Sequence, residues 1–363
     1  MNSDQESASP PRRMQEFETV LEQSDRQVVE FEQQHRSLLQ GLQHFLHGNP
    51  TAVPVIVLIL GVIVFGLIAG DRFLSTFNMS LIIQQVSIIG ILAAAQSLIV
   101  LTAGIDLSVA AIMVLASVVI GKFAVVVGVP APLAILCGLV LGYLCGMLNG
   151  LLVTRIKLPP FIVTLGTWNI FFALNLWYSG AQSIRSQDID AEAPLLKLFG
   201  EGMLIAGVKF TYGSFLMVAI FLVLWYVLNR TAWGRHVYAV GDDKDAAELS
   251  GIQTDRTLRS VYAVAGVICA IGAWAAIGRV GSVSPQSFYE GNLESITAVV
   301  IGGISLFGGR GSILGPLVGA LIVGVFQSGL RIAGVDVLWQ VFAIGWLIII
   351  AVAIDQWIRR VSA

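Results

Sequence analysis

Polar side chains recur inside long apolar stretches of this sequence, and their types limit the chemistry that the chain can support. The candidates are Gln85, Gln96, Asn149, Thr164, Thr167, Trp168, Asn175, Glu294 and Thr297, with Gln327 as a further one. In a membrane such groups are costly unless they face protein or water. Amides, hydroxyls and aromatic planes suit a neutral polyhydroxyl solute and suit an ion poorly. We interpret these residues as candidates for a solute path, with interhelical hydrogen bonding as the alternative for each.

The spacing of these residues places several of them on common helix faces. Gln85 and Gln96 are eleven residues apart, which is about three helical turns. A second set shares one face of a later helix and consists of Thr164, Thr167, Trp168, Phe171 and Asn175.

Asp106 is the only acidic residue that long apolar runs flank on both sides. A proton or sodium carrier would need such a carboxylate, so a coupling-ion site is one interpretation. Gly104 before it and Ser108 after it favour another, in which the chain breaks here and Asp106 caps the next helix. We expect the cap, with Gly104, Asp106 and Ser108 as a structural motif.

The motifs of a self-sufficient enzyme are missing from the sequence. It has no G-x-x-x-x-G-K-[ST] cradle for ATP, and no Ser/His/Asp or Cys/His set can be assembled convincingly. Cys137, Cys145 and Cys269 lie in apolar runs, and zinc is not expected. Outside the first fifty residues His236 is the only histidine. We therefore expect no catalytic residue, metal or cofactor on this chain.

The elements that must position the polar residues are membrane-spanning helices. The chain has 363 residues, 56% hydrophobic and 12% charged, against about 25% charged residues in a soluble domain. A net charge of -2 provides no basic field for nucleic acid. Runs of about 20 apolar residues can cross the bilayer as helices. We expect an all-α polytopic bundle of about ten spans, at 52–70, 81–105, 107–121, 131–154, 161–180, 211–229, 260–278, 295–309, 312–330 and 337–354.

Residues 1–50 form a polar, acidic tail, and residues 51–363 form the membrane domain. Apolar residues recur about every 3.5 positions from Phe17 to Phe45, which predicts an amphipathic helix. Because the helix is acidic, we favour contact with a partner protein over lipid, and a solvated helix is the alternative. Basic residues concentrate in alternate loops, which predicts that both termini are cytoplasmic.

The loop 230–259 is the most informative polar stretch and is predicted to be cytoplasmic. We expect Asp242 to cap a short helix that runs through Ser250, with Gly251 as its stop. Such a helix can fit a groove on a partner, and a plain surface loop is the alternative. The candidate contact residues are Arg235, Asp242, Asp245, Ala246, Ala247, Glu248, Leu249 and Gly251, of which Ala246, Ala247 and Leu249 would form a flat apolar surface.

Glycines repeat every fourth residue along one predicted span, at Gly138, Gly142, Gly146 and Gly150. This spacing makes a groove on one helix face where a second backbone can approach closely. Gly315 and Gly319 repeat the pattern in a later span. We expect tight helix packing, with a sliding interface as the alternative.

Three segments together resemble the permease subunit of ribose- and fructose-type sugar ATP-binding-cassette (ABC) importers. They are Thr102–Val109, Leu158–Thr167 and Ala298–Ser312, and the loop 234–252 is similar to the family's ATPase-contacting loop. Two departures stand out: Ala110 lies where the family commonly has glycine, and Asp242–Lys244 replaces a Gly–Asn-like turn.

The resemblance implies a type II importer permease with about ten helices in a bacterial inner membrane. It implies a second permease copy, either identical or related, a cytoplasmic ATPase that binds ATP and magnesium, and a periplasmic sugar-binding protein. The implied substrate is a monosaccharide such as ribose, fructose or xylose, with fructose favoured slightly. The alternative is an ion-coupled carrier of a sugar or another small solute that acts alone.

Overall fold

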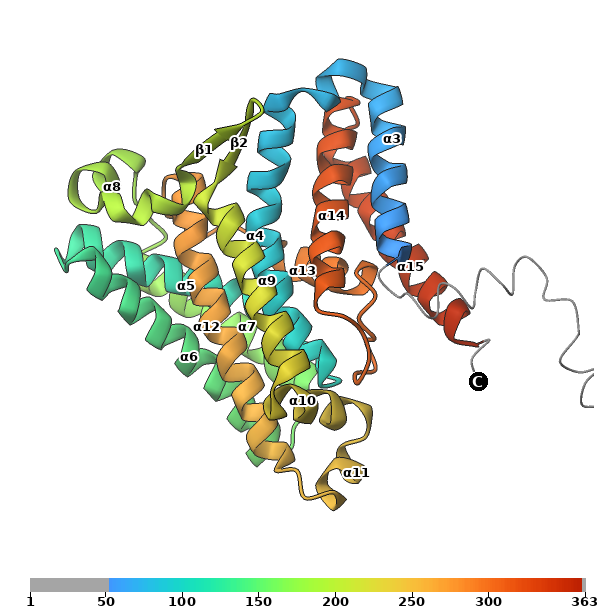
Figure 1. The fold of residues 1–363 in the computed structure, drawn as a ribbon. Coiled ribbons are helices and arrows are strands. Elements are labelled where there is room, and N and C mark those ends of the chain that lie inside the picture. Colours follow the sequence, from blue (N-terminus) through green and yellow to red (C-terminus); the bar gives the residue numbers. More distant parts are fainter. Residues whose placement is uncertain (1–51, 361–363) are drawn as a thin grey trace, which may run out of the picture. The chain divides into compact units, whose positions relative to one another are not determined.

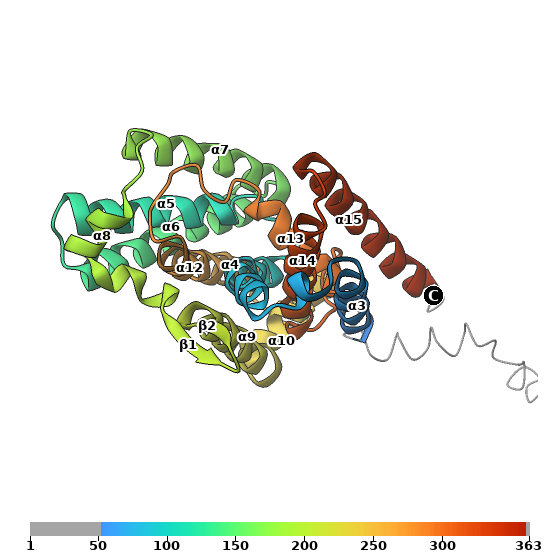
Figure 2. The same cartoon turned by 90° about the horizontal axis from the view of Figure 1, so that it is seen from above.

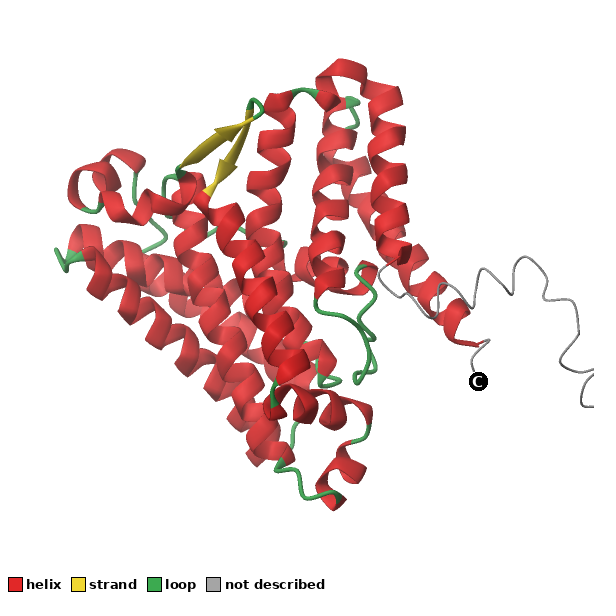
Figure 3. Cartoon of the chain, in the orientation of Figure 1, coloured by secondary structure: helices red, strands yellow, loops and turns green. Residues whose placement is uncertain are grey.

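The computed structural model describes residues 52–360, and it is almost entirely helical (Figures 1 and 3). The predicted tail, including the amphipathic helix at 17–45, lies outside the described residues. Within the described part, eight helices are long and apolar enough to cross a membrane. They are α3 (Ala52–Leu74), α4 (Thr76–Leu101), α5 (Val109–Gly121) with the π-helical turn η1 (Lys122–Val126), α6 (Ala131–Arg155), α7 (Pro160–Ser179), α9 (Tyr212–Arg230), α12 (Thr254–Val280) and α14 (Leu314–Ile332).

The remaining elements are shorter or lie at the chain's end. They are α8 (Ser186–Glu192), η2 (Pro194–Gly200), the antiparallel strands β1 (Gly202–Ile205) and β2 (Val208–Thr211), α10 (Ala232–Asp242), α11 (Lys244–Leu249), α13 (Gly291–Ile301) and α15 (Val337–Arg360). Neither the short helix α8 nor the β-hairpin is among the predicted spans.

One of the ten predicted spans is not a crossing helix. The stretch 295–309 contains the end of α13 and then an irregular glycine-rich loop. With eleven residues, α13 is about 16 Å long, roughly half of the hydrocarbon thickness. The tenth predicted span, 337–354, lies within α15. The sequence 295–309, rich in apolar residues and glycine, therefore forms the end of a half-length helix and a partly buried loop and not a spanning helix.

Helices α4 and α12 form the centre of the bundle, and α3 lies at its edge (Figure 2). In the apolar window of α4, 83% of the residues are buried, compared with 17% in α3. The outer helices expose large apolar side chains, including Leu67 at 81% and Trp177 at 79%. Because soluble proteins rarely expose such continuous apolar surface, these faces fit a lipid environment.

The glycine stripe of α6 packs directly against the backbone of α12, as the sequence predicted. A Cβ atom added to Gly142 would collide with the carbonyl of Gly266, and one added to Gly146 would collide with the carbonyl of Tyr262. Gly150 continues the stripe against Arg259, whereas Gly138 faces Ile120 of α5. The two helices therefore approach as closely as backbones permit.

Several of the short elements lie at the two ends of the bundle. The hairpin, α8 and η2 lie at one end, and α10 and α11 lie at the other (Figure 1). We call these the hairpin end and the α10 end.

Candidate functional site

A buried break in the chain joins α4 to α5 between Thr102 and Ser108. Ala103 adopts a left-handed conformation with φ of 59°, which turns the chain. The carboxylate of Asp106 is 2% exposed, and its Oδ1 accepts hydrogen bonds from both the amide and the hydroxyl of Ser108, each at 2.6 Å. Ser108, not Asp106, occupies the N-cap position of α5. The predicted cap is thus corrected: Asp106 fixes the capping residue and lies two positions earlier.

Three of the residues predicted for a solute path hold this break from three different helices. Asn149 of α6 donates to the Ser108 hydroxyl at 2.8 Å, and Thr164 of α7 donates to the Ile105 carbonyl at 3.0 Å. The side-chain amide of Gln96 on α4, oriented with its nitrogen toward Asp106, donates to the main-chain carbonyl of Asp106 at 3.0 Å. The bonds from Thr164 and Gln96 satisfy main-chain groups that a break inside the membrane leaves without helical partners, and the bond from Asn149 holds the Ser108 side chain.

Asn292 completes the start of α5, and sequence reasoning missed it. Its side-chain oxygen accepts from the amide of Ala110 at 2.7 Å, across a sequence separation of 182 residues. Gly291 lies opposite Ala110, and a Cβ atom added to Gly291 would lie 3.2 Å from the Cβ of Ala110. The absence of a side chain at Gly291 leaves space for Ala110 at the position where the resembling family commonly has glycine.

At the α10 end, the glycine-rich loop 302–313 packs between the end of α4 and the end of α10. Gly309 donates its amide to the carbonyl of Leu101 at 2.9 Å. A Cβ added to Gly241 of α10 would collide with that carbonyl, and one added to Gly308 would lie 2.7 Å from the amide of Ala103. We call this contact among α10, the loop and the break the glycine junction.

Two side chains reinforce the position of α10. Tyr238 donates its hydroxyl to the carbonyl of Gly311 at 2.9 Å, and burial raises the pKa of this hydroxyl, which keeps it a donor. Trp233 donates its indole N–H to Ser260 of α12 at 2.7 Å. Helix α10 is therefore tied both to the loop and to the central helix of the bundle.

Helix α11 forms the most prominent surface of the α10 end. Its N-cap is Asp243, whose carboxylate accepts from the amides of Asp245 and Ala246 at 2.9 Å each. The expectation that Asp242 is the cap was wrong, because Asp242 is the last residue of α10 and the chain turns after it. The predicted stop is confirmed: Gly251 follows the helix with φ of 86°.

The exposed face of α11 differs from the predicted one at a single position. Ala247 is 5% exposed and packs against Val240 and Leu258, so it belongs to the interior. Leu249 is 91% exposed at the tip of the helix. The other contact candidates, Arg235, Asp242, Asp245, Ala246, Glu248 and Gly251, are all exposed. Asp242 also lies 3.8 Å from Arg310, an exposed pair that contributes little.

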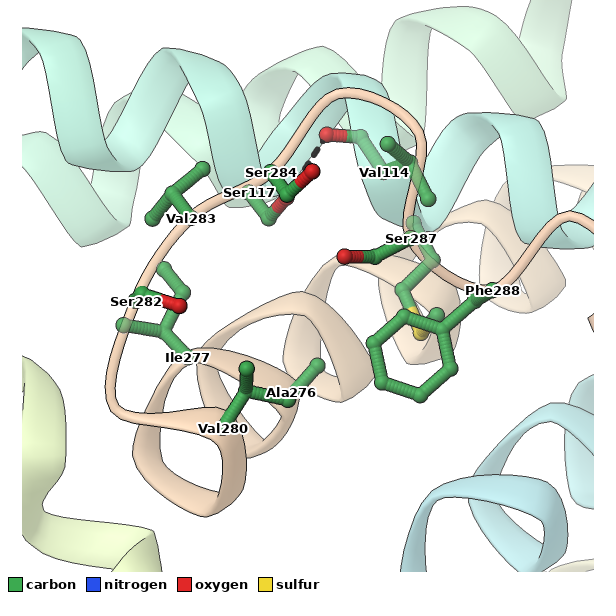
Figure 4. A pocket seen from close by; sticks show the side chains of 11 residues that line it. Val114, Ser117, Ala276, Ile277, Val280, Ser282, Val283, Ser284, Ser287 and Phe288 are labelled. Atoms are coloured by element: carbon green, nitrogen blue, oxygen red, sulfur yellow. Dashed lines mark hydrogen bonds between the residues drawn. The ribbon is translucent and has the colours of Figure 1, made fainter. Parts of the chain in front are cut away.

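At the hairpin end, the segment 281–290 crosses above α5 and connects α12 to α13. Ile184 and Val283 exchange two main-chain hydrogen bonds at 2.9 and 3.1 Å, and Asn175 of α7 donates to the carbonyl of Pro285 at 2.7 Å. Figure 4 shows this segment arching over a small hollow that Ser117 and Ser284 both line. Asn175, a predicted path residue, thus holds a loop in place.

A second, shallow cleft lies beside the first and carries an aromatic pair. Trp168 of α7 and Tyr289 lie with their ring centroids 5.9 Å apart, and Phe172 contacts the same tyrosine at 6.1 Å. Asn175 and Asn292 contribute amides to the lining of this cleft. Tyr289 is 60% exposed, and Trp168 is partly exposed, so part of this aromatic pair is accessible at the surface.

The remaining path candidates make contacts within or between helices. Gln327 of α14 donates to the carboxylate of Glu294 at 2.7 Å and accepts from Gln85 of α4, so three helices share one polar chain. Thr297 donates to Leu293 of its own helix at 2.6 Å. Thr167 is 2% exposed and lies on the buried face of α7 with Thr164, Phe171 and Asn175.

The described residues do not bring together the usual ligand set of a metal ion. Between residues 52 and 360 no cluster of three or more His, Cys, Asp or Glu side chains could hold an ion. The described cysteines, Cys137, Cys145 and Cys269, are free thiols inside or beside the bundle.

The comparisons with known proteins agree with this architecture. A family described as the permease component of a branched-chain amino acid transport system matches residues 78–352. The fructose import permease protein FrcC of Rhizobium meliloti is 60% identical over 349 residues, 96% of this chain and 97% of that protein. The ribose import permease protein RbsC of Bacillus subtilis is 36% identical over 289 residues, 80% and 88% of the two chains.

A third relative, the D-allose transport system permease protein AlsC of Escherichia coli, is 33% identical over 304 residues, 84% of this chain and 91% of that protein. No solved structure matches the chain. The fold and these similarities define a multi-pass membrane permease. The chain belongs to the family of permease subunits of sugar ABC importers.

Proposed function

We propose that the chain imports fructose, or a monosaccharide that closely resembles it, across the inner membrane of a bacterium. The similarity to a fructose import permease over nearly the whole length of both chains supports this substrate. In this proposal two permease chains enclose the path, a periplasmic binding protein delivers the sugar, and a cytoplasmic ATPase drives transport. ATP and magnesium are bound on the ATPase and not on this chain.

The observation that carries the proposal is the glycine junction. The α10–α11 pair presents an exposed leucine at its tip, whereas its root contacts the glycine-rich loop and the end of α4. A partner that pushes on Leu249 therefore moves α10 against backbone, with no flexible side chain between Gly241 and Leu101 to absorb the motion. Packed interfaces transmit such displacements because they have few intermediate arrangements. We assign the α10 end to the cytoplasm on this ground and on its basic loops.

The sugar path in this proposal passes the aromatic cleft of Trp168 and Tyr289. Ring faces bind the apolar C–H faces of a pyranose or furanose ring, and nearby amides bind its hydroxyls. Seen from above, α13 lies between α7 and α15, and the exposed sides of these helices would face the second permease copy (Figure 2). Gln85 and Glu294, both partly exposed, lie on the other side of α13 and extend the polar lining.

Reconstituted transport tests the proposal against the ion-coupled carrier. The purified chain is placed in proteoliposomes with or without its ATPase and binding protein, and uptake of labelled fructose is measured. We expect uptake only with both partners and ATP, and none under a proton or sodium gradient alone. Gradient-driven uptake by the chain alone would establish the carrier instead. Competition by ribose, allose and xylose then ranks the sugars.

A further inference from the structure

A long apolar groove runs along the outer surface between α6 and α12, on the α10 half of the bundle. Its lining consists of Tyr143, Met147, Arg256, Arg259, Ser260, Ala263, Val264, Val267 and Ile268. The empty volume of the groove, including the space at its open side, is about 1010 Å³, and the same volume for the aromatic cleft is about 290 Å³. Tyr143 and Met147 border the groove on α6, next to the glycine stripe that packs against α12.

The groove is polar and cationic at one end only. Arg256 is exposed and Arg259 partly exposed at the α10 end, whereas the part that runs from Ala263 to Ile268 is apolar. Gly150 lies opposite Arg259 on the antiparallel helix, which places Arg155 level with the first turn of α12. The end of the groove therefore carries an excess of positive charge.

No described carboxylate neutralises the two groove arginines. The ion pairs among the described residues involve Lys197, Lys244 and Arg310. Asp255, the nearest acid in sequence, is paired with Lys244. Arg259 makes one bond, through Nε to the main-chain carbonyl of Asp255 at 3.1 Å, which leaves its other guanidinium donors available.

The length of the groove matches one leaflet of a bilayer. Arg259 and Ile268 are nine residues apart on a helix, which corresponds to about 14 Å. This is close to half of the roughly 30 Å of hydrocarbon that a bilayer contains. A charged group held at the arginines would thus place an attached acyl chain along the whole apolar part of the groove.

We propose that this groove binds an anionic phospholipid, with the phosphate at Arg256 and Arg259 and one acyl chain against Tyr143, Met147 and Val264. Guanidinium groups bind phosphate oxygens bidentately, and an apolar furrow binds an acyl chain through the same contacts as a protein core. The lipid lies beside the glycine contact and touches both α6 and α12. Because the site faces lipid, it is independent of which sugar the protein carries.

Native mass spectrometry of the purified full-length chain tests this proposal. Phosphatidylglycerol and phosphatidylcholine are each titrated into delipidated protein, and the fraction of lipid-bound protein is measured. We expect tighter binding of phosphatidylglycerol. Arg256→Gln and Arg259→Gln should each weaken it about fivefold, the effect of one basic residue at an anionic lipid. Val264→Trp, which fills the apolar part, should weaken both lipids.

Two matched controls separate the groove from the general surface. Arg230→Gln removes an exposed arginine from the α10 end of α9, outside the groove, and Leu144→Trp adds an indole to the exposed face of α6 beside it. Both should leave lipid binding unchanged, and only variants with the wild-type melting temperature are compared.

Three results would overturn the proposal. Equal binding of the two lipids would remove the charge recognition. Equal losses in Arg230→Gln and Arg256→Gln would indicate diffuse attraction to a basic surface. Unchanged binding in Val264→Trp, together with displacement by soluble glycerol phosphate, would show a phosphate site without an acyl chain.

Discussion

Gly309 donates its main-chain amide to the carbonyl of Leu101 at 2.9 Å, so that the loop after the half-length helix α13 is bonded to the last turn of α4. Both residues also contact Gly241 at the end of α10. At Leu101, Gly241 and Gly309, three segments that are far apart in the sequence therefore meet through main-chain atoms.

Gly309→Ala should uncouple the ATPase from the sugar path. Gly309 has φ of 67°, and an added Cβ would lie 2.5 Å from the Cα of Asp242. We expect ATP-driven uptake to fall at least tenfold while the ATPase still binds. The matched control is Gly334→Ala, since Gly334 has φ of 77° but no neighbour within 4 Å. Both changes carry about 1–2 kcal/mol of left-handed strain, so equal losses of uptake would contradict a role for the junction.

The exposed tip of α11 should be required for binding of the ATPase. Glu248→Arg combined with Leu249→Asp reverses one charge and removes an apolar anchor that is 91% exposed. We expect loss of a contact of about 2 kcal/mol, or roughly thirtyfold in affinity, measured by pull-down of the ATPase. Leu204→Asp is the control, because Leu204 is 75% exposed at the hairpin end. Normal pull-down by the double variant would count against the proposed contact surface.

Gly142→Ala should destabilise the protein, although alanine is the better helix former. The added methyl group meets the Gly266 carbonyl, and overpacking of this kind costs about 1–3 kcal/mol. Gly166→Ala on α7 is the matched control, since no atom lies within 4 Å of its added Cβ; there alanine should gain up to about 1 kcal/mol. Thermal unfolding in detergent measures both, and an identical melting temperature for the two variants would refute the packing argument.

Asp106→Asn and Asp106→Ala should differ in their effects. Asparagine keeps an oxygen that can accept from Ser108, so we expect ATP-driven uptake within a few-fold of the wild type. Alanine leaves the buried Ser108 amide without that acceptor, at a cost of about 1–3 kcal/mol, visible as a lower melting temperature. If a well-folded Asp106→Asn protein lost all transport, the negative charge itself would be essential, as in an ion-coupled carrier.

Trp168→Ala should weaken transport without unfolding the bundle. The change removes one ring of the aromatic cleft, for which we expect a loss of about 1 kcal/mol, or roughly fivefold in apparent affinity for the sugar. Trp177→Ala on the same helix is the control, because Trp177 is 79% exposed and lies outside the aromatic cleft. The outcome that contradicts the proposed path is an unchanged concentration dependence of uptake in Trp168→Ala.

Much of the fold could be predicted because membrane helices obey simple rules of length and composition. Eight spans, the close packing of Gly142 and Gly146, and the stop at Gly251 all follow from local sequence. The half-length helix α13 did not, because apolar residues and glycines are equally compatible with a spanning helix and with a loop buried in protein.

The side-chain contacts of the break were less accessible to sequence reasoning. Gln96, Asn149 and Thr164 were recognised as polar groups in the membrane, but their partners depend on which helices become neighbours. Asn292, which binds the Ala110 amide, lies 182 residues away and carries no local signal. Asp242 and Asp243 are adjacent, and only the turn after α10 decides which of them caps α11.

The mutual contact of Gly142 and Gly266 also limits how this protein can evolve. Each glycine would meet the carbonyl oxygen of the other if it gained a side chain, so neither position can be made smaller to accommodate a change in its partner. Second-site suppressors of a substitution at Gly142 must therefore arise elsewhere, in residues that let the two helices separate along their whole length.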